Sequence, residues 1–329
     1  MAKDVSKYAK FDPAFATDGL FVPTARKGQA LYDVGRDLDG GEIRFEGVQL
    51  TAAHQSVLLA VCARTGRGGL RVRGTKDDPL GAQYGIRFEG DQDAATRNIR
   101  ALNPKGAPTE EEMAVVECSA YAILADAGMD DGGNNYATLS RLLTQLGTVV
   151  MYRRVGKRGG SSNLLSFEHD GDRMSIALNW RLAASILGDK QNIQVSLYER
   201  QRLGGAVSRL LHAWLSCYVR QGHSLMNGQG AKLDTLARHI WGKRPASPGV
   251  VRNRRSDLRK AIEEIGRLPG WSASVDSKNI AHFTRPKDVD IELPGDDAEA
   301  KERLERFTDA FFRGDVDVVD GSPVLKKKG

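Results

Sequence analysis

The sequence is poor in cysteine and has no long apolar run. Its three cysteines, Cys62, Cys118 and Cys217, lie far apart among apolar residues, which favours buried thiols over a disulfide or zinc framework. No run of about 18 apolar residues occurs, so we expect neither a membrane-spanning helix nor a membrane partner. Residues 1–13, MAKDVSKYAKFDP, lack the apolar stretch of a secretory signal, and we therefore expect a cytoplasmic protein.

The sequence also lacks the motifs of two classes of enzyme. It has no G-x-x-x-x-G-K-[ST] loop, which an ATP-driven motor uses to cradle phosphates. Its six histidines include no His-x-His or His-x-x-x-His pair, which a nicking enzyme needs to hold a metal ion beside its tyrosine nucleophile. We therefore expect a protein that is not an enzyme, with no catalytic residue, no metal site and no cofactor.

Positive charge is concentrated in one part of the chain. Residues 198–287 contain 17 Lys and Arg against 6 Asp and Glu, a net of +11, whereas residues 288–329 contain 7 against 12, a net of −5. The first 197 residues balance at 24 against 24. A local excess of this kind is typical of a surface that neutralises phosphates.

A two-faced basic helix is predicted at the centre of this positive region. Residues 250–266, VVRNRRSDLRKAIEEIG, follow Ser247 and Pro248, which can cap and start a helix, and end at Gly266. At about 100° per residue, one stripe is apolar and the opposite side is polar. The stripe contains Val251, Leu258, Ile262 and Ile265, and the polar side contains Arg252, Asn253, Ser256, Arg259 and Lys260. Taken alone, such a helix is also compatible with an ordinary solvated surface.

The neighbouring segments favour a DNA-reading module. An apolar helix with RLLHAWL (residues 209–215) and a short helix KLDTLARHIWG (232–242) precede the turn KRPASPG (243–249) and the basic helix. Two strand-like pieces, WSASV (271–275) and NIAHFTR (279–285), follow it. Helix, helix, recognition helix and hairpin is the order of a winged helix.

A less basic copy of the same plan precedes it. Helices are predicted at residues 51–64, 119–127 and 134–146, followed by a hairpin over 148–170 that carries Lys157 and Arg158 near its tip. The strand-like residues 173–179 could complete this sheet. The third helix presents Asn134, Arg141 and Gln145 on its polar side. The basic hairpin tip is explained equally well by phosphate contact and by solubility.

These patterns predict an α+β protein with two tandem winged-helix domains. We expect a first domain over residues 47–190 and a second, the main DNA reader, over 191–287, with the boundary near 188–194. Residues 1–46 form an arm with strands that could pair between subunits, and 288–329 form an acidic tail with a helix at 300–312. The Gly- and Pro-rich insert at 66–112 is expected to be a partly strand-forming loop.

Several of these segments together resemble a known family. In the second half they are RLLHAWL, KLDTLARHIW, RNRRSDLRKAIEEI (252–265), the pair Gly270 and Trp271, and TRPK (284–287). In the first half they are GLFVPTARKG (19–28) and IRFEGVQLTAAHQSVLLAV (43–61). Their order and spacing resemble the iteron-binding replication initiators of broad-host-range plasmids, of the RepC type and the related RepA initiators, and more distantly the TrfA initiators. The insert and the acidic tail look longer than the family core.

The resemblance implies that each recognition helix enters a major groove of directly repeated origin sites. Carried over to this chain, the base readers are Arg252, Asn253, Ser256 and Arg259, with phosphate contacts from Arg255 and Lys260. The first-half candidates are Asn134, Arg141, Gln145, Lys157 and Arg158. Expected partners are double-stranded DNA at the origin repeats, a host initiator, a replicative helicase and a second copy of the chain.

Two other functions stay open at this point. A transcriptional regulator with tandem winged helices would bind DNA with the same chemistry, and repeated sites beside an AT-rich stretch would favour replication over regulation. A rolling-circle nicking enzyme is disfavoured by the missing histidine pair, and a nicked product from supercoiled origin DNA with magnesium would reverse that interpretation.

Overall fold

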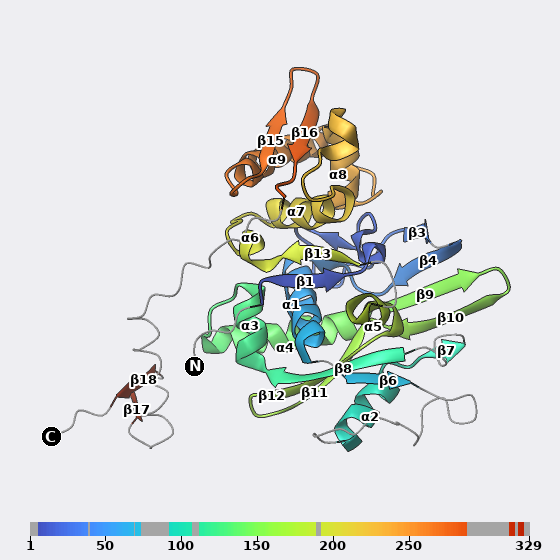
Figure 1. The fold of residues 1–329 in the computed structure, drawn as a ribbon, viewed down its shortest axis with the longest axis vertical. Coiled ribbons are helices and arrows are strands. Elements are labelled where there is room, and N and C mark those ends of the chain that lie inside the picture. The colour runs from blue at the N-terminus through green and yellow to red at the C-terminus, as the bar shows by residue number, and fades with distance from the viewer. Residues whose placement is uncertain are drawn as a thin grey trace. The chain divides into compact units, whose positions relative to one another are not determined.

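The computed structural model is a mixed α/β fold built mainly from one continuous core (Figure 1). It describes residues 6–38, 40–68, 70–73, 92–106, 112–188, 192–287, 316–319 and 322–325. One compact unit spans Ser6–Asp288. The hairpin of β17 (Val316–Val319) and β18 (Ser322–Leu325) belongs to a second unit. The predicted helix at 300–312 lies outside the described residues.

The N-terminal segment packs against both halves of the chain. Its elements are β1 (Tyr8–Phe11), the 3-10 turn η1 (Pro13–Ala16), β2 (Phe21–Val22), β3 (Val34–Leu38), β4 (Gly41–Glu46) and β5 (Leu50–Thr51). β1 pairs with β13 (Ile193–Ser196) beyond the expected domain boundary, and β2 contacts helices of both halves. Phe11, Phe15 and Leu20 are fully buried there. The subunit contact expected of this segment stays a prediction.

The three predicted first-half helices are present. They are α1 (Ala52–Gly68), α3 (Ala120–Ala127) and α4 (Gly133–Gly147). α1 is the central helix, with residues 57–62 fully buried and contacts to α3, α4 and β1. Ser119 caps α3 by accepting a hydrogen bond from the amide of Ala122, and Gly128 ends it in the left-handed conformation. The spacing of leucines in α4 buries Leu139, Leu142, Leu143 and Leu146, as expected.

The predicted hairpin over 148–170 is divided between two sheets. Strands β9 (Val150–Val155) and β10 (Arg158–Asn163) form the hairpin and belong to the sheet β3-β4-β9-β10-β7, in which β7 is Lys105–Gly106. At the buried Leu164 the chain leaves this sheet. β11 (Leu165–Asp170) then pairs with β12 (Arg173–Leu178) in the second sheet, β11-β12-β8-β6. The expectation that residues 173–179 complete the hairpin sheet was therefore wrong, because β12 pairs with β8 (Glu112–Ser119) in the second sheet.

The insert contains a helix as well as short strands, so the prediction of a partly strand-forming loop was right about the strands and missed the helix. After β6 (Leu70–Arg73), helix α2 (Gln92–Ala101) lies against β11 and β12. Ile99 and Leu102 are buried, and Asn98 donates to the carbonyl of Ser175 at 3.0 Å. The bond between Asn98 and Ser175 joins residues 77 positions apart, so local composition could not show it. Residues 69, 74–91 and 107–111 of the insert lie outside the described part of the chain.

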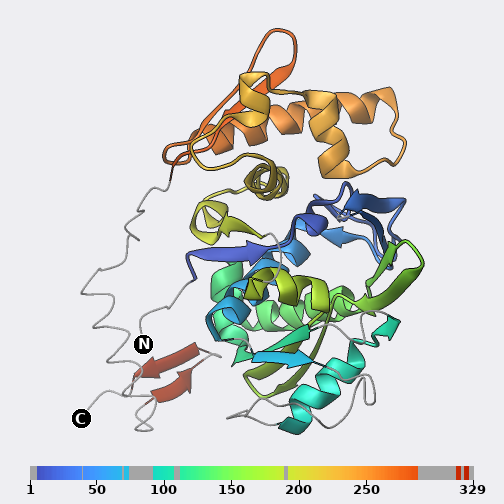
Figure 2. The ribbon, with the colours of Figure 1, turned by 45° about the vertical axis from the view of Figure 1, so that its right-hand side comes forward.

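The second half contains every element predicted for it. After α5 (Trp180–Leu187), β13 and α6 (Leu197–Gln201), the chain forms α7 (Ala206–Tyr218), η3 (Leu225–Gly228), β14 (Ala231–Lys232), α8 (Leu233–Trp241), α9 (Pro248–Gly266), β15 (Ser272–Val275) and β16 (Ile280–Thr284). Helices α7, α8 and α9 contact one another, and β14, β16 and β15 form one small sheet (Figures 1 and 2). No helix of the described residues is long and apolar enough to span a membrane.

Candidate nucleic-acid interface

Helix α9 buries one stripe and exposes a basic one, as its sequence predicts. Pro248 occupies the first helical turn after Ser247, although the Ser247 side chain makes no capping hydrogen bond. The residues that pack inward are Leu258, Ala261, Ile262 and Ile265. The predicted site residues on the opposite side, Arg252, Asn253, Ser256, Arg259 and Lys260, are all exposed.

Four of these side chains are available to a ligand. Within the described residues, the side chains of Arg252, Asn253, Ser256 and Lys260 make no hydrogen bond or ion pair with the rest of the protein. Arg and Asn can each form two hydrogen bonds to a base edge in a major groove. The free donors therefore lie on the side of α9 that faces away from the core.

Two other predicted residues already have partners. Arg255 donates twice to the Asp234 carboxylate on α8, at 2.7 and 2.6 Å, and this hydrogen bonding lowers the pKa of Asp234. Arg259 donates to the side-chain oxygen of Asn279 at the turn between β15 and β16. These contacts join α9 to α8 and to the hairpin. A DNA phosphate would have to compete with Asp234 for the Arg255 side chain. The phosphate contact of Arg255 stays a prediction.

The β15–β16 turn adds one cation that the sequence analysis did not select. Asp276 accepts hydrogen bonds from the amides of Lys278 and Ile280, both at 2.9 Å, and Asn279 has a positive φ of 60°. This tight turn leaves Lys278 exposed at its tip. Its position two residues after Asp276 was the available signal, because Asp commonly accepts backbone hydrogen bonds in such a turn.

The first-half candidates lie on two separate elements. Asn134 and Arg141 are exposed on α4, and Lys157 and Arg158 are exposed at the tip between β9 and β10. Gln145 differs from them: it is half-buried, and its side-chain oxygen lies 2.8 Å from Nε2 of His54 on α1. Nδ1 of His54 accepts from the Thr51 amide, so Nε2 carries the hydrogen that Gln145 accepts. Gln145 therefore supports the packing of α1 against α4, and its reading of DNA stays a prediction.

No metal centre is present in the described parts of the chain: no three His, Cys, Asp or Glu side chains there are grouped to hold an ion. Cys62, Cys118 and Cys217 are free thiols, as expected. Burial raises the pKa of the Cys118 thiol to about 11.

The family model of replication protein C (RepC) matches residues 7–287. The chain belongs to the RepC family. This is a family of replication initiators, and the match confirms the resemblance seen in the sequence. Among solved structures, the chain is similar to domains 2 and 3 of RctB, with 11% sequence identity, coverage of 85% of this chain and 100% of that chain, and a TM-score of 0.47. No curated protein matches the chain.

Three of the segments that carry the resemblance place side chains in the interior. His212 of RLLH, Trp271 and Arg285 of TRPK are all buried. Glu199 on α6 accepts hydrogen bonds from Nε2 of His212 at 2.8 Å and from Nε1 of Trp271 at 3.0 Å. Arg285 donates to the carbonyls of Ser216, Val219 and Gln194. These motif residues hold α6, α7 and the β15–β16 hairpin together, and they lie away from the exposed face of α9.

The RepC-family chain is expected to lose stability as the pH falls below the ordinary histidine pKa of 6.5. Burial lowers the pKa of His212, and the hydrogen bond to Glu199 opposes this only in part. Below pH 6.5 the unfolded chain therefore binds a proton that the folded chain does not, so acidification favours unfolding. Urea unfolding of the parent and of His212→Gln at pH 7.5 and 5.5 checks this. The variant should lose less stability on acidification, and equal losses would contradict the assignment.

Proposed function

We propose that this replication initiator binds directly repeated origin sites as a duplex-reading protein with two tandem winged-helix units. The observation that carries the proposal is the exposed face of α9, where Arg252, Asn253, Ser256 and Lys260 have no partner among the described residues. The local net charge of +11 over residues 198–287 supports it. We assign base reading to this face, phosphate contacts to Arg255 and Lys260, and origin opening to strain in the bound DNA.

The order of elements supports two winged-helix units. In the second half, α7, α8 and α9 are followed by the β15–β16 hairpin, and β14 joins the same sheet. In the first half, α1, α3 and α4 are followed by the β9–β10 hairpin, with the insert between α1 and α3. In such modules the last helix enters the major groove and the hairpin lies beside it. In this proposal the first unit binds DNA more weakly than the second, through Asn134 and Arg141 on α4 and Lys157 and Arg158 at the hairpin tip.

The proposed function does not require the protein to catalyse a reaction. Unwinding and priming fall to partners, namely a host initiator and a replicative helicase, and a second copy of the chain can share the origin. Family membership favours replication over a purely regulatory role. Incubation with supercoiled origin DNA and magnesium should leave the DNA intact, whereas a nicked product would overturn the non-enzymatic assignment.

Arg252→Ala is expected to cost about 1–3 kcal/mol of binding free energy and to relax the preference at one base position, because one bidentate contact to a guanine is lost. The preferred duplex is first selected from a random pool with the full chain. Titration of parent and variant against that duplex and against single-base substitutions then checks the prediction. Lys10→Ala, an exposed change outside α9, is the control of equal charge. A parent that selects no sequence would contradict the proposed function.

A further inference from the structure

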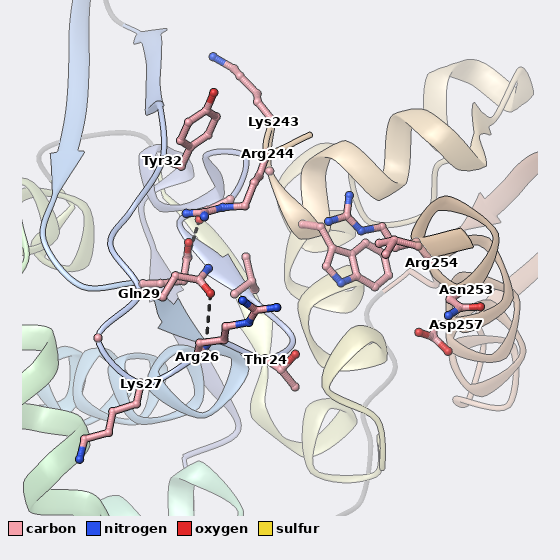
Figure 3. A pocket seen from close by; sticks show the side chains of 17 residues that line it. Thr24, Arg26, Lys27, Gln29, Tyr32, Lys243, Arg244, Asn253, Arg254 and Asp257 are labelled. Atoms are coloured by element: carbon pink, nitrogen blue, oxygen red, sulfur yellow. Dashed lines mark hydrogen bonds between the residues drawn. The ribbon is translucent and has the colours of Figure 1, made fainter. Parts of the chain in front are cut away.

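A basic cleft lies between the N-terminal segment and the start of α9. Its volume is about 630 Å³, and one wall is the loop over residues 24–32, while the other is the turn after α8 with the first turns of α9 (Figure 3). Of the described residues that line it, five carry a positive charge and one, Asp257, carries a carboxylate. The five cations are Arg26, Lys27, Lys243, Arg244 and Arg254.

The two walls are held in place by contacts that need no ligand. Gly19 and Gly242 both have positive φ, and their backbones meet so closely that a Cβ on Gly19 would lie 2.8 Å from Cα of Gly242. Lys243 pairs with Asp33 at 3.0 Å, and Arg244 donates to the carbonyl of Ala30 at 3.1 Å. Residues more than 200 positions apart therefore build one cleft.

Three of these cations, Arg26, Arg244 and Arg254, form no ion pair among the described residues and have N–H groups that can bind an anion. The side chain of Arg26 is exposed, has no partner within the described residues, and points across the cleft toward α9 (Figure 3). Arg244 and Arg254 stack on the rings of Tyr32 and Trp241, at 5.3 and 5.4 Å from the ring centres. Nε of Arg254 is buried and has no hydrogen-bond partner in the part of the chain that the structure describes. Stacking orients a guanidinium but leaves its N–H groups able to bind an anion.

We propose that this cleft binds the phosphodiester backbone of the duplex whose major groove α9 enters. The inference rests on the proposed function, because it takes α9 as the groove-reading helix. Asn253 belongs both to the exposed face of α9 and to the cleft wall, so a strand bordering that groove passes directly into the cleft. Phosphate contacts fix the register of a protein on DNA while base contacts specify sequence. Arg26 and Arg244 are the phosphate ligands, and the loop over residues 24–32 closes on the strand from the side opposite α9.

Arg26→Ala tests the proposal because the exposed Arg26 side chain has no partner to lose among the residues that the structure describes. Each phosphate contact contributes about 0.9 to the slope of log affinity against log salt concentration. When the salt concentration rises fourfold, a protein that lacks one contact should therefore lose about 3.5-fold less affinity than the parent loses. We expect this smaller slope for Arg26→Ala on the selected duplex, with unchanged base preference, while Lys10→Ala keeps the parental slope. Equal slopes for Arg26→Ala and the parent would overturn the cleft assignment.

Neutral methylphosphonates, placed one at a time along the selected duplex, identify the phosphate concerned. At one position, the methylphosphonate should weaken DNA binding by the parent protein but cause no further loss of affinity in the Arg26→Ala variant. If every position weakens both proteins equally, the cleft does not hold the backbone. If Arg26→Ala weakens binding to a single strand but not to the duplex, the assignment to duplex DNA is wrong. These failures differ from failure of the proposed function, in which the parent would show no sequence preference and Arg252→Ala no effect.

Discussion

Glu199→Ala is expected to lower the free energy of unfolding by about 2–5 kcal/mol, since two buried donors would lose their acceptor. Glu199 is only 6% exposed and accepts from His212 and Trp271. Burial alone would raise the pKa of Glu199, but the hydrogen bonds from His212 and Trp271 outweigh it and hold that pKa below its usual value. The carboxylate is therefore charged and strongly bound at neutral pH.

Urea unfolding at neutral pH measures the effect. Glu199→Gln should lie between the parent and the alanine variant, because its amide oxygen can accept from one donor while its NH₂ group faces the other. Glu263→Ala is the matched control: Glu263 is exposed on α9, and its ion pair with Arg267 is worth little at such a surface. A Glu199→Ala protein as stable as Glu263→Ala would show that the network does not stabilise the fold.

Gly242→Ala is expected to cost about 2–4 kcal/mol, because alanine would combine backbone strain with a clash. Gly242 has φ 75° and ψ −170°, a conformation that side chains rarely adopt. Its Cβ would lie 2.9 Å from Cα of Gly19, so the N-terminal segment would have to move away from the end of α8. The variant should thus both unfold more easily and bind DNA less tightly through a widened cleft.

Gly188→Ala is the control for a glycine with positive φ that has no close neighbour. Gly188 also has a positive φ, 93°, but an added Cβ there meets nothing within 4 Å. It should lose roughly 1 kcal/mol in urea unfolding and keep parental DNA affinity. If Gly242→Ala behaved like Gly188→Ala in both measurements, the close approach of the two glycine backbones would not be needed for the cleft.

The helices and their faces were the most predictable part of the protein. The leucine spacing of α4 and the two-faced pattern of α9 are local properties, and the structure confirms both. The failures were pairings between distant segments. β12 belongs to the second sheet, where it pairs with β8. Helix α2 formed where Ile99 and Leu102 could pack on that sheet.

The candidate site divides in the same way. Arg252, Asn253 and Lys260 could be placed on one exposed side from their spacing alone. The roles of Arg255 and Gln145 could not, because Asp234 lies 21 residues and His54 91 residues away in the chain. The loop over residues 24–32, which carries Arg26, was also missed, since no sequence pattern near Arg26 predicts that the loop lies beside α9.

The sequence by itself determined helices α1, α3, α4, α7, α8 and α9, the β15–β16 hairpin, the concentration of positive charge and the resemblance to the RepC family. The helices and the hairpin depend on periodicity and on capping and turn residues, which act over a few neighbouring positions. Only the tertiary structure decided which arginines are already paired, that His212, Trp271 and Arg285 lie in the interior, and that Gly19 meets Gly242 beside a basic cleft. Those outcomes depend on contacts between residues far apart in the chain, which close packing selects and local patterns do not encode.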